Sequence, residues 1–275
     1  MKFKPILLSV ILLVAIQTFA QALDENVTPR FVHKSKVPIW LNMGAGLDVV
    51  DSYDNGTIPY NYIGFGGNLR LGATVEWRRC HVQTETSLLG SMFVDLGGYA
   101  VDIDSRTEFL YRCYDNKRNR LHLWAGGAMQ TFYDIKSISA LMNASTGVSI
   151  FFNVCAEGMM QYDFAFIRGG SHNLLSAYGK LSLPIAGLVT RPGYAYMDNY
   201  TSDIDMVNTI LEDYVSFGKW FPGVSTDLGL YFNLLNGNRI GFSYRWDYLT
   251  TRHKGTYRYD NAIHSFNINF MFNLN

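Results

Sequence analysis

The sequence predicts an all-β fold in which antiparallel strands close into a membrane-spanning barrel. The first observation is a period of two: between Tyr99 and Tyr114, charged and apolar residues alternate, as in Asp102-Ile103-Asp104. Successive side chains of a strand point to opposite faces, so this stretch predicts one two-faced β-strand. The second observation is that similar long segments recur along nearly the whole chain. Such strands suit a barrel with lipid on one side of its wall and a polar lumen on the other.

The N-terminus predicts export. Two lysines precede an apolar run from Ile6 to Ile16, and small residues follow, with cleavage expected after Ala20 or Ala22. The run is too short to span a bilayer and is typical of a signal peptide. No later stretch of about twenty apolar residues follows, so membrane residence must come from strands. The regions we expect are a signal peptide, a periplasmic segment and a barrel: 1–22, 23–37 and 38–275.

Composition agrees with this class. Without Lys2 and Lys4 of the signal peptide, 21 basic residues face 23 acidic ones, a balance of −2. A near-neutral chain has no electrostatic basis for binding nucleic acid. Mean hydropathy is close to zero although 15% of the residues are aromatic. A two-faced strand produces this result because its apolar and polar faces average out.

Reading the alternation outward from turn residues gives ten strands, and counts of eight or twelve stay open because the fourth and sixth have soft boundaries. The strands, each with an apolar and a polar residue that mark its two faces, are Pro38–Val49 (Leu47, Asp48), Tyr62–Trp77 (Leu69, Arg70), a strand with polar face His81, Gln83 and Glu85, Tyr99–Tyr114 (Ile103, Asp104), a strand from Leu121 (Leu123, His122), Ile150–Asp163 (Phe152, Asn153), Leu174–Leu188 (Leu181, Lys180), Val224–Asn233 (Leu228, Asp227), Ile240–Tyr248 (Tyr244, Arg245) and Phe266–Leu274 (Phe266, Asn267).

The connections alternate in length. Those after even-numbered strands are short and polar: Arg78-Arg79, Asn116–Asn119, Gly169-Gly170-Ser171 and Asn236-Gly237-Asn238. Those after odd-numbered strands are mostly longer: Asp51–Asn61, Leu96–Tyr99 (the short exception), Asp134–Thr146, Val189–Trp220 and Thr251–Asn261. An even strand count with alternating tight and long connections is typical of periplasmic turns and extracellular loops.

A soluble secreted barrel or sandwich would also alternate. The membrane is favoured because the polar face carries acids and bases that would be costly in a dry core, while the other face keeps leucine, isoleucine and phenylalanine. Aromatic residues also gather near strand ends, as interfacial girdles do. They are Trp40, Tyr60, Tyr62, Trp77, Tyr111, Tyr114, Tyr133 and Tyr248.

Over its mature length the chain resembles the small outer-membrane β-barrel proteins of Gram-negative bacteria. The resemblance implies residence in the outer membrane, contact with its lipid and lipopolysaccharide, and insertion by the barrel assembly machinery. Barrels of this class usually end on an aromatic residue, whereas here Leu274 holds the last apolar position. The Gly-, Asn- and Tyr-rich composition is similar to that of barrels from the Bacteroidota. The resemblance is to an architecture and brings no active site with it.

The charged polar face is the main candidate site. In a ten-stranded barrel these side chains would face one another, with both signs present so that pairing offsets the cost of burial. We favour a salt-bridge network that fills the lumen; the alternative is a polar path for a small solute, with Arg106 and Arg245 opposing the acids. The predicted network consists of Asp48, Arg70, Glu76, Glu85, Asp102, Asp104, Arg106, Glu108, Arg112, Glu157, Asp163, Lys180, Asp227, Arg245 and Asp247.

The longest connection predicts a short helix between the seventh and eighth strands. Ser202 to Asp205 form a capping pattern, and apolar residues from Ile204 to Val215 recur at helical spacing. The helix could cover the barrel mouth, enter the lumen or present a surface. Acidic residues flank it, but their spacing does not match an EF-hand. We predict no metal and no cofactor.

The sequence favours a non-catalytic function, either a narrow pore for small solutes or a scaffold that binds at the cell surface. The alternative is a hydrolase that cleaves lipid or peptide at the extracellular rim. Several lipolytic outer-membrane barrels resemble one another in placing His and Ser two residues apart, on one strand face. Here His264-Ser265 and Ser171-His172 are adjacent, so we assign no catalytic residue.

The three cysteines leave two alternatives open. Cys80 begins the third strand and Cys113 ends the fourth, both on the outward face. They form either a cross-strand disulfide in the oxidising periplasm or two free thiols. Cys155 points inward and has no partner. Their spacing matches no metal site.

Overall fold

The computed structural model describes residues 37–55, 58–77, 79–116, 120–138, 146–164, 175–190, 215–218, 223–234, 236–251 and 258–274. Three predicted features lie outside these residues: the signal peptide over 1–22, all but Val37 of the periplasmic segment, and the helix from Ser202, except that Val215 begins a strand. None of the described segments is a helix of the length and apolar character needed to cross a membrane.

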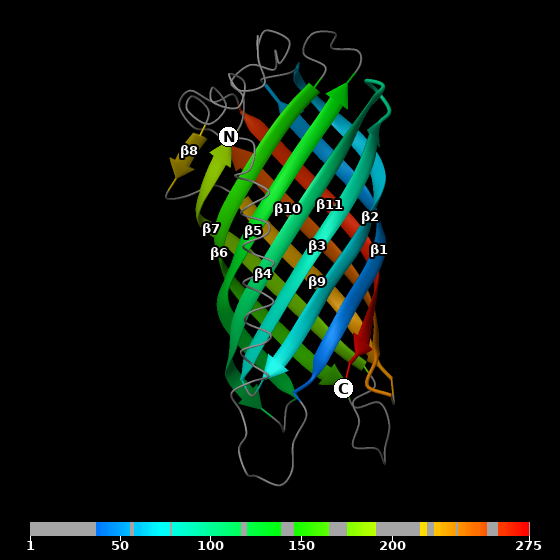
Figure 1. Ribbon diagram of the computed structural model, residues 1–275, viewed down its shortest axis with the longest axis vertical. Coiled ribbons are helices and arrows are strands. Elements are labelled where there is room, and N and C mark those ends of the chain that lie inside the picture. The colour runs from blue at the N-terminus through cyan, green and yellow to red at the C-terminus, as the bar shows by residue number, and fades with distance from the viewer. Residues whose placement is uncertain are drawn as a thin grey trace, which may run out of the picture. The chain divides into compact units, whose positions relative to one another are not determined.

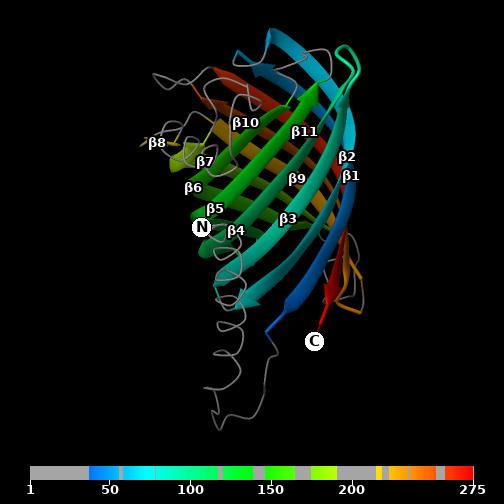
Figure 2. The same ribbon diagram turned by 45° about the horizontal axis from the view of Figure 1, so that its top comes forward.

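Ten long antiparallel strands form a closed ring, as predicted (Figure 1). The ring closes because β1 pairs with both β2 and β11, while β6 pairs with β7. A short eleventh strand, β8, pairs only with the end of β7 and stands outside the ring (Figure 2). The strands are β1 (Ile39–Asp54), β2 (Ile58–Trp77), β3 (Cys80–Phe93), β4 (Gly98–Asn116), β5 (Leu121–Ile138), β6 (Thr146–Phe164), β7 (Leu175–Thr190), β8 (Val215–Gly218), β9 (Gly223–Asn233), β10 (Arg239–Thr251) and β11 (Tyr259–Asn273).

The register tilts the strands strongly against the barrel axis. Followed through β2 to β5, the row of partners that starts at Asp48 reaches β6 at Gly147. Followed the other way, through β11, β10, β9 and β7, the same row reaches β6 at Met159, twelve residues further along. This offset is the shear of the barrel, which sets the tilt. Residues of one row therefore lie at different heights.

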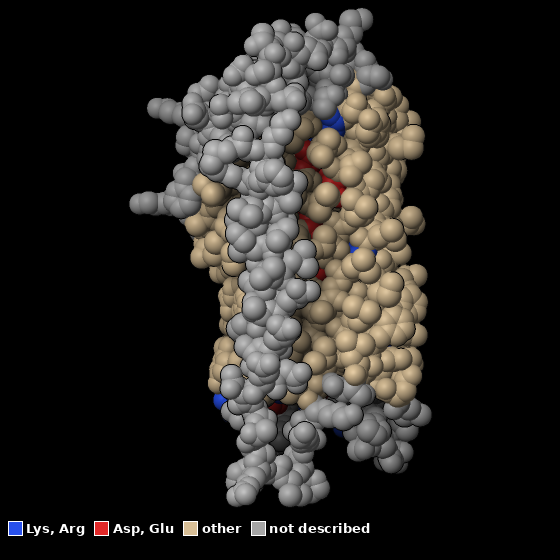
Figure 3. All heavy atoms as spheres, viewed as in Figure 1, with Lys and Arg blue, Asp and Glu red and all other residues tan. Residues whose placement is uncertain are grey.

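The two faces of the wall have the predicted polarity. On β1, Leu47 is 72% exposed on the outside, while Asp48 next to it is 2% exposed in the lumen. Leu69 and Phe266 on the neighbouring strands are also exposed on the outside. On the face drawn in Figure 3, nearly all of the described wall is neither acidic nor basic. Such an outer surface is suited to lipid.

Several strands extend beyond the predicted ends. We call the end where β1 begins and β11 finishes the terminal end, and the opposite end the loop end. At the loop end the predicted connection Asp51–Asn61 is wrong, because β1 continues to Asp54 and β2 begins at Ile58. Likewise β5 continues to Ile138 and β11 begins at Tyr259. The polar residues at the end of β1 have the composition of a loop, yet β1 stays paired with both β2 and β11 as far as Asp54.

Candidate functional site

The lumen is filled in three layers. A vestibule lined mainly by polar side chains occupies the terminal end, a charged layer lies above it, and an apolar plug closes the loop end. The charged layer consists of Asp48, Arg70, Glu85, Asp104, Arg106, Glu108, Glu157, Lys180, Asp227, Arg245 and Asp247. The apolar plug consists of Val50, Tyr62, Leu89, Phe93, Ala100, Phe132, Ile138, Phe151, Val189, Leu249, Tyr259 and Ile263.

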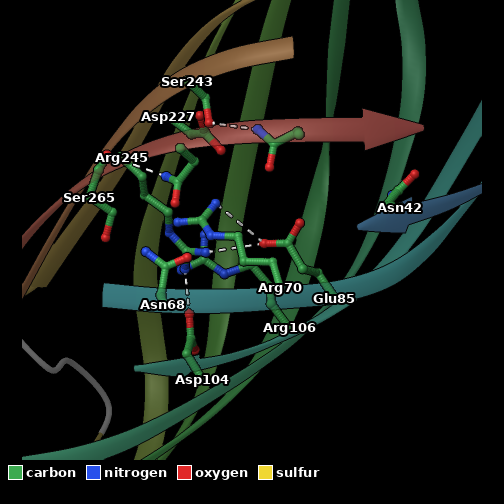
Figure 4. Close-up of polar contacts among 12 residues, drawn as sticks. Asn42, Asn68, Arg70, Glu85, Asp104, Arg106, Asp227, Ser243, Arg245 and Ser265 are labelled. Atoms are coloured by element: carbon green, nitrogen blue, oxygen red, sulfur yellow. Dashed lines mark hydrogen bonds and ion pairs between the residues drawn. The ribbon is translucent and has the colours of Figure 1, made fainter. Parts of the chain in front are cut away.

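Arg245 on β10 is the centre of the charged layer. Its guanidinium lies 2.5 Å from Oδ2 of Asp104, 2.7 Å from Oδ2 of Asp247 and 3.5 Å from Oε1 of Glu85. Arg70 reaches the same Glu85 oxygen at 3.6 Å. Figure 4 shows Arg70, Glu85, Asp104 and Arg245 converging from β2, β3, β4 and β10. One buried arginine therefore connects three carboxylates from three different strands.

The rest of the charged layer is paired in the same way. Lys180 donates to Glu108 at 2.5 Å and lies 3.7 Å from Glu157. Asn68 donates to both oxygens of Asp48, at 2.8 and 2.9 Å. Arg106 bonds Ser225 and lies 3.5 Å from Asp247. Buried charges are stable only when paired and hydrogen-bonded in this manner.

Four members of the predicted network lie outside the charged layer. Glu76, Arg112 and Asp163 lie at the terminal end, where they pair with Arg239, Asp115 and His122 respectively. Asp102 lies on the opposite side of the layer, toward the apolar plug. The other eleven predicted residues form the layer. Eleven of the fifteen predicted residues thus lie together in the middle of the lumen, and the other four lie on either side of them.

The apolar plug was missed by the sequence analysis. Its side chains come from nine strands and pack ring against ring: Tyr62 and Phe93 meet edge to face with centroids 4.9 Å apart, and Phe151 lies 5.4 Å from Tyr259. The available signal was the pair of consecutive apolar residues at several strand ends, such as Phe151-Phe152. In a membrane barrel, a strand segment that is apolar on both faces has one face toward lipid and the other packed inside the lumen.

A small polar island lies within the plug. Its members are Ser52, Asp102, Asp134 and Lys136. The Lys136 ammonium lies 2.8 Å from Oδ2 of Asp134 and donates to Ser52 at 2.6 Å. The Tyr259 hydroxyl donates to the same Asp134 oxygen at 2.5 Å. Neither Asp134 nor Lys136 was predicted as a lumen residue, because both were placed in the connection Asp134–Thr146.

The cavities between these layers have the size of water molecules. One of about 20 Å³ lies between the charged layer and the plug, and one of about 50 Å³ forms the vestibule. A single water needs roughly 10–15 Å³ by this measure. The vestibule is bordered by the stacked rings of Tyr178 and Tyr231, 4.8 Å apart, and by His81. Side chains thus fill most of the lumen.

The described histidines near a serine or threonine do not form a nucleophilic triad in the two places where the sequence or the contacts bring them close. At the terminal end, Ser176 donates to Asp163 at 2.8 Å, and Asp163 lies 3.3 Å from Nε2 of His122. In a nucleophilic triad the base must contact the nucleophile, whereas here the carboxylate separates them. His264 points outward and bonds the Tyr244 hydroxyl at 2.7 Å. Among the described residues, no three His, Cys, Asp or Glu side chains are grouped to hold a metal.

The described cysteines are free thiols. Cys80 lies opposite Tyr111 in the ladder, and Cys113 falls at a register shift between Arg112 and Tyr114. The structure therefore has the free-thiol alternative, because Cys113 lies two positions beyond Tyr111, the residue opposite Cys80. Cys155 is buried in the lumen, as its alternation predicted.

Comparison with known proteins supports the architecture. No family model matches the sequence, and a search of curated proteins finds no relative. Among solved structures, the chain is similar to the outer membrane protease OmpT from Escherichia coli, with 7% identity over 89% of this chain and 99% of that chain and a TM-score of 0.51. It is also similar to Neisserial surface protein A (NspA), with 10% identity over 84% and 97% and a TM-score of 0.34. The chain is a closed antiparallel β-barrel with the same fold as the OmpT barrel.

Proposed function

We propose that this protein is a non-catalytic outer-membrane barrel with a sealed lumen, which acts as a scaffold for its loop end. The observation that carries the proposal is the apolar plug above the charged layer. In outer-membrane barrels the longer connections are extracellular, so the loop end would face the outside of the cell and the vestibule the periplasm.

Two successive barriers support a sealed lumen rather than a pore. A solute would have to separate the ion pairs of Arg245, which are buried and mutually satisfied. It would then have to displace packed rings such as Phe132 and Phe151, whose centroids lie 6.0 Å apart. Barrels of eight strands are commonly filled by side chains, and this ten-stranded barrel has the same character. The scaffold function therefore has more structural support than the narrow pore.

Conductance in a planar bilayer tests the seal. Purified wild-type protein should give no steady ion steps. Phe151→Ala combined with Phe132→Ala removes two plug rings, and Phe152→Ala is the matched control because its side chain faces lipid. We expect all three proteins to stay silent, since the charged layer still closes the lumen. Steady conductance of the wild type would contradict the proposal.

Hydrolysis is tested on the same preparations. Phospholipid vesicles and a mixed peptide library, incubated with wild-type protein, should be recovered intact. Turnover that scales with protein concentration and survives repurification would overturn the non-catalytic part of the proposal. A hydrolase at the extracellular rim would then be the better function.

A further inference from the structure

The lumen contains more acids than bases. From the charged layer up to the polar island, the described residues include nine carboxylates and five cations. The carboxylates are Asp48, Glu85, Asp102, Asp104, Glu108, Asp134, Glu157, Asp227 and Asp247, and the cations are Arg70, Arg106, Lys136, Lys180 and Arg245. Ion pairing within this set cannot neutralise every carboxylate. A buried, unneutralised carboxylate is very costly, so the excess carboxylates must be balanced by protons or by another cation in the lumen.

Among the described lumen carboxylates, Asp102 has neither an ion pair nor a hydrogen bond to an oxygen. It is 2% exposed, and neither of its oxygens has a hydrogen-bond partner. Its ladder partner across β4 and β5 is Asp134, another acid. Like charges directly opposite each other destabilise a sheet. Lys136 and Tyr259 both contact Oδ2 of Asp134, while its Oδ1 also has no hydrogen-bond partner.

A second unpartnered side chain faces the same space. Asn261 on β11 is 2% exposed, and neither its amide oxygen nor its amide nitrogen has a partner. Both Asp102 and Asn261 border the cavity of about 20 Å³ between the charged layer and the plug. Ser87 and Gln130 border it too, so residues with side-chain oxygens from four strands surround one small void.

The charged residues on the other side of this cavity are already neutralised. Arg70 and Arg245 also border it, together with Asp104 and Asp247. Each guanidinium lies within 3.6 Å of a carboxylate of the charged layer. The cavity lining therefore carries three acids against two bases, and Asp102 is the surplus charge.

We infer that a monovalent cation of the size of Na⁺ binds in this cavity, between Asp102 and Asn261. Asp102 and Asn261 offer unpartnered oxygens, which suit a hard cation, and the volume accepts one ion with at most one water. Calcium sites usually contain several carboxylates. One surplus carboxylate, Asp102, is balanced by a single positive charge, which favours a monovalent ion. This site is independent of whether the barrel conducts.

Unfolding in urea, monitored by tryptophan fluorescence of the detergent-solubilised protein, tests the site. NaCl is titrated against choline chloride at constant ionic strength and constant pH. A ligand that binds only the folded state raises the folding equilibrium constant in proportion to its concentration once above its Kd. We expect an approximately tenfold rise for each tenfold rise in Na⁺ in the wild type, and none in Asp102→Asn.

Controls separate this site from general charge effects. Asp227→Asn removes another lumen carboxylate, one that accepts from Tyr178 and does not border the cavity. It should keep the Na⁺ response. Asn261→Ala removes an amide ligand but keeps the carboxylate, so it should weaken the response and serves if Asp102→Asn does not fold. An equal response to choline, or a Na⁺ response retained in Asp102→Asn, would overturn the inference. Stability that depends on pH but not on Na⁺, and loses this dependence in Asp102→Asn, would show that a proton occupies the site instead.

Discussion

The charged layer and the apolar plug close the same lumen by different physical means. In the charged layer, specific pairs such as Arg245 with Asp104 must meet at fixed distances, and removing one partner leaves a buried charge. In the plug, rings such as Phe151 and Tyr259 pack without directional bonds, so the cost of a change follows the volume removed. The comparison shows that one barrel wall can support both a polar and an apolar interior, depending on which residues its inward positions carry.

The largest effect is expected from breaking the charged layer at its centre. Arg245→Met leaves Asp104 and Asp247 without their nearest cation, and should lower the free energy of unfolding by about 3–5 kcal/mol. Urea unfolding of the folded barrel measures this change. Arg239→Met is the matched control, because Arg239 is partly exposed and pairs with Glu76 at 3.6 Å. A loss in the control equal to that of Arg245→Met would contradict the central role.

The next effect concerns the plug. Phe151→Ala should cost about 3 kcal/mol, since a buried ring is removed and its neighbours close the space only in part. Its control, Phe152→Ala, changes a lipid-facing ring on the same strand and should cost clearly less. Urea unfolding measures the free energy of unfolding of both variants, and amide hydrogen exchange of β6 is a second readout. Equal losses would mean that the plug does not pack as a core.

A smaller effect should come from the polar island. Tyr259→Phe keeps the ring in the plug but removes the hydroxyl that donates to Asp134. Hydrogen bonds to charged groups contribute about 1.5–3 kcal/mol, and the ring contact with Phe151 is retained. We expect a loss of about 2 kcal/mol, measured as a lower urea midpoint with an unchanged slope. No loss would show that Lys136 alone satisfies Asp134.

The smallest effect should come from the outside of the wall. Thr86 and Ser105 share a hydrogen bond of 2.8 Å across β3 and β4, on the exposed face. Cross-strand pairs of this kind contribute roughly 0.2–1 kcal/mol, so Thr86→Val should change stability by less than about 1 kcal/mol. A larger decrease in the free energy of unfolding, measured in urea, would indicate that the outer face contributes to stability as much as the lumen does.

The sequence allowed the wall to be predicted better than the lumen. A period of two identifies each strand and assigns Leu47 outward and Asp48 inward, whatever lies across the barrel. The shear of the barrel determines which inward-facing residues come into contact across the lumen. Arg245 and Asp104 are 141 positions apart, and no local pattern brings them together. The plug was missed for a related reason: Tyr62 and Tyr259 lie in segments whose composition is typical of loops and interfaces, and only closure of the ring places them in one core.

The seam between β1 and β11 has a consequence for assembly. Arg245 lies on β10, next to the C-terminal edge of the sheet, while its partners Glu85 and Asp104 lie on β3 and β4, near the N-terminal edge. In an open sheet both groups are hydrated and far apart. They meet only when β1 joins β11 along its whole length, from Trp40 opposite Asn273 to Asp54 opposite Tyr259. A half-closed barrel would desolvate its charges before they were matched, so closure of the seam is expected to be an all-or-none event.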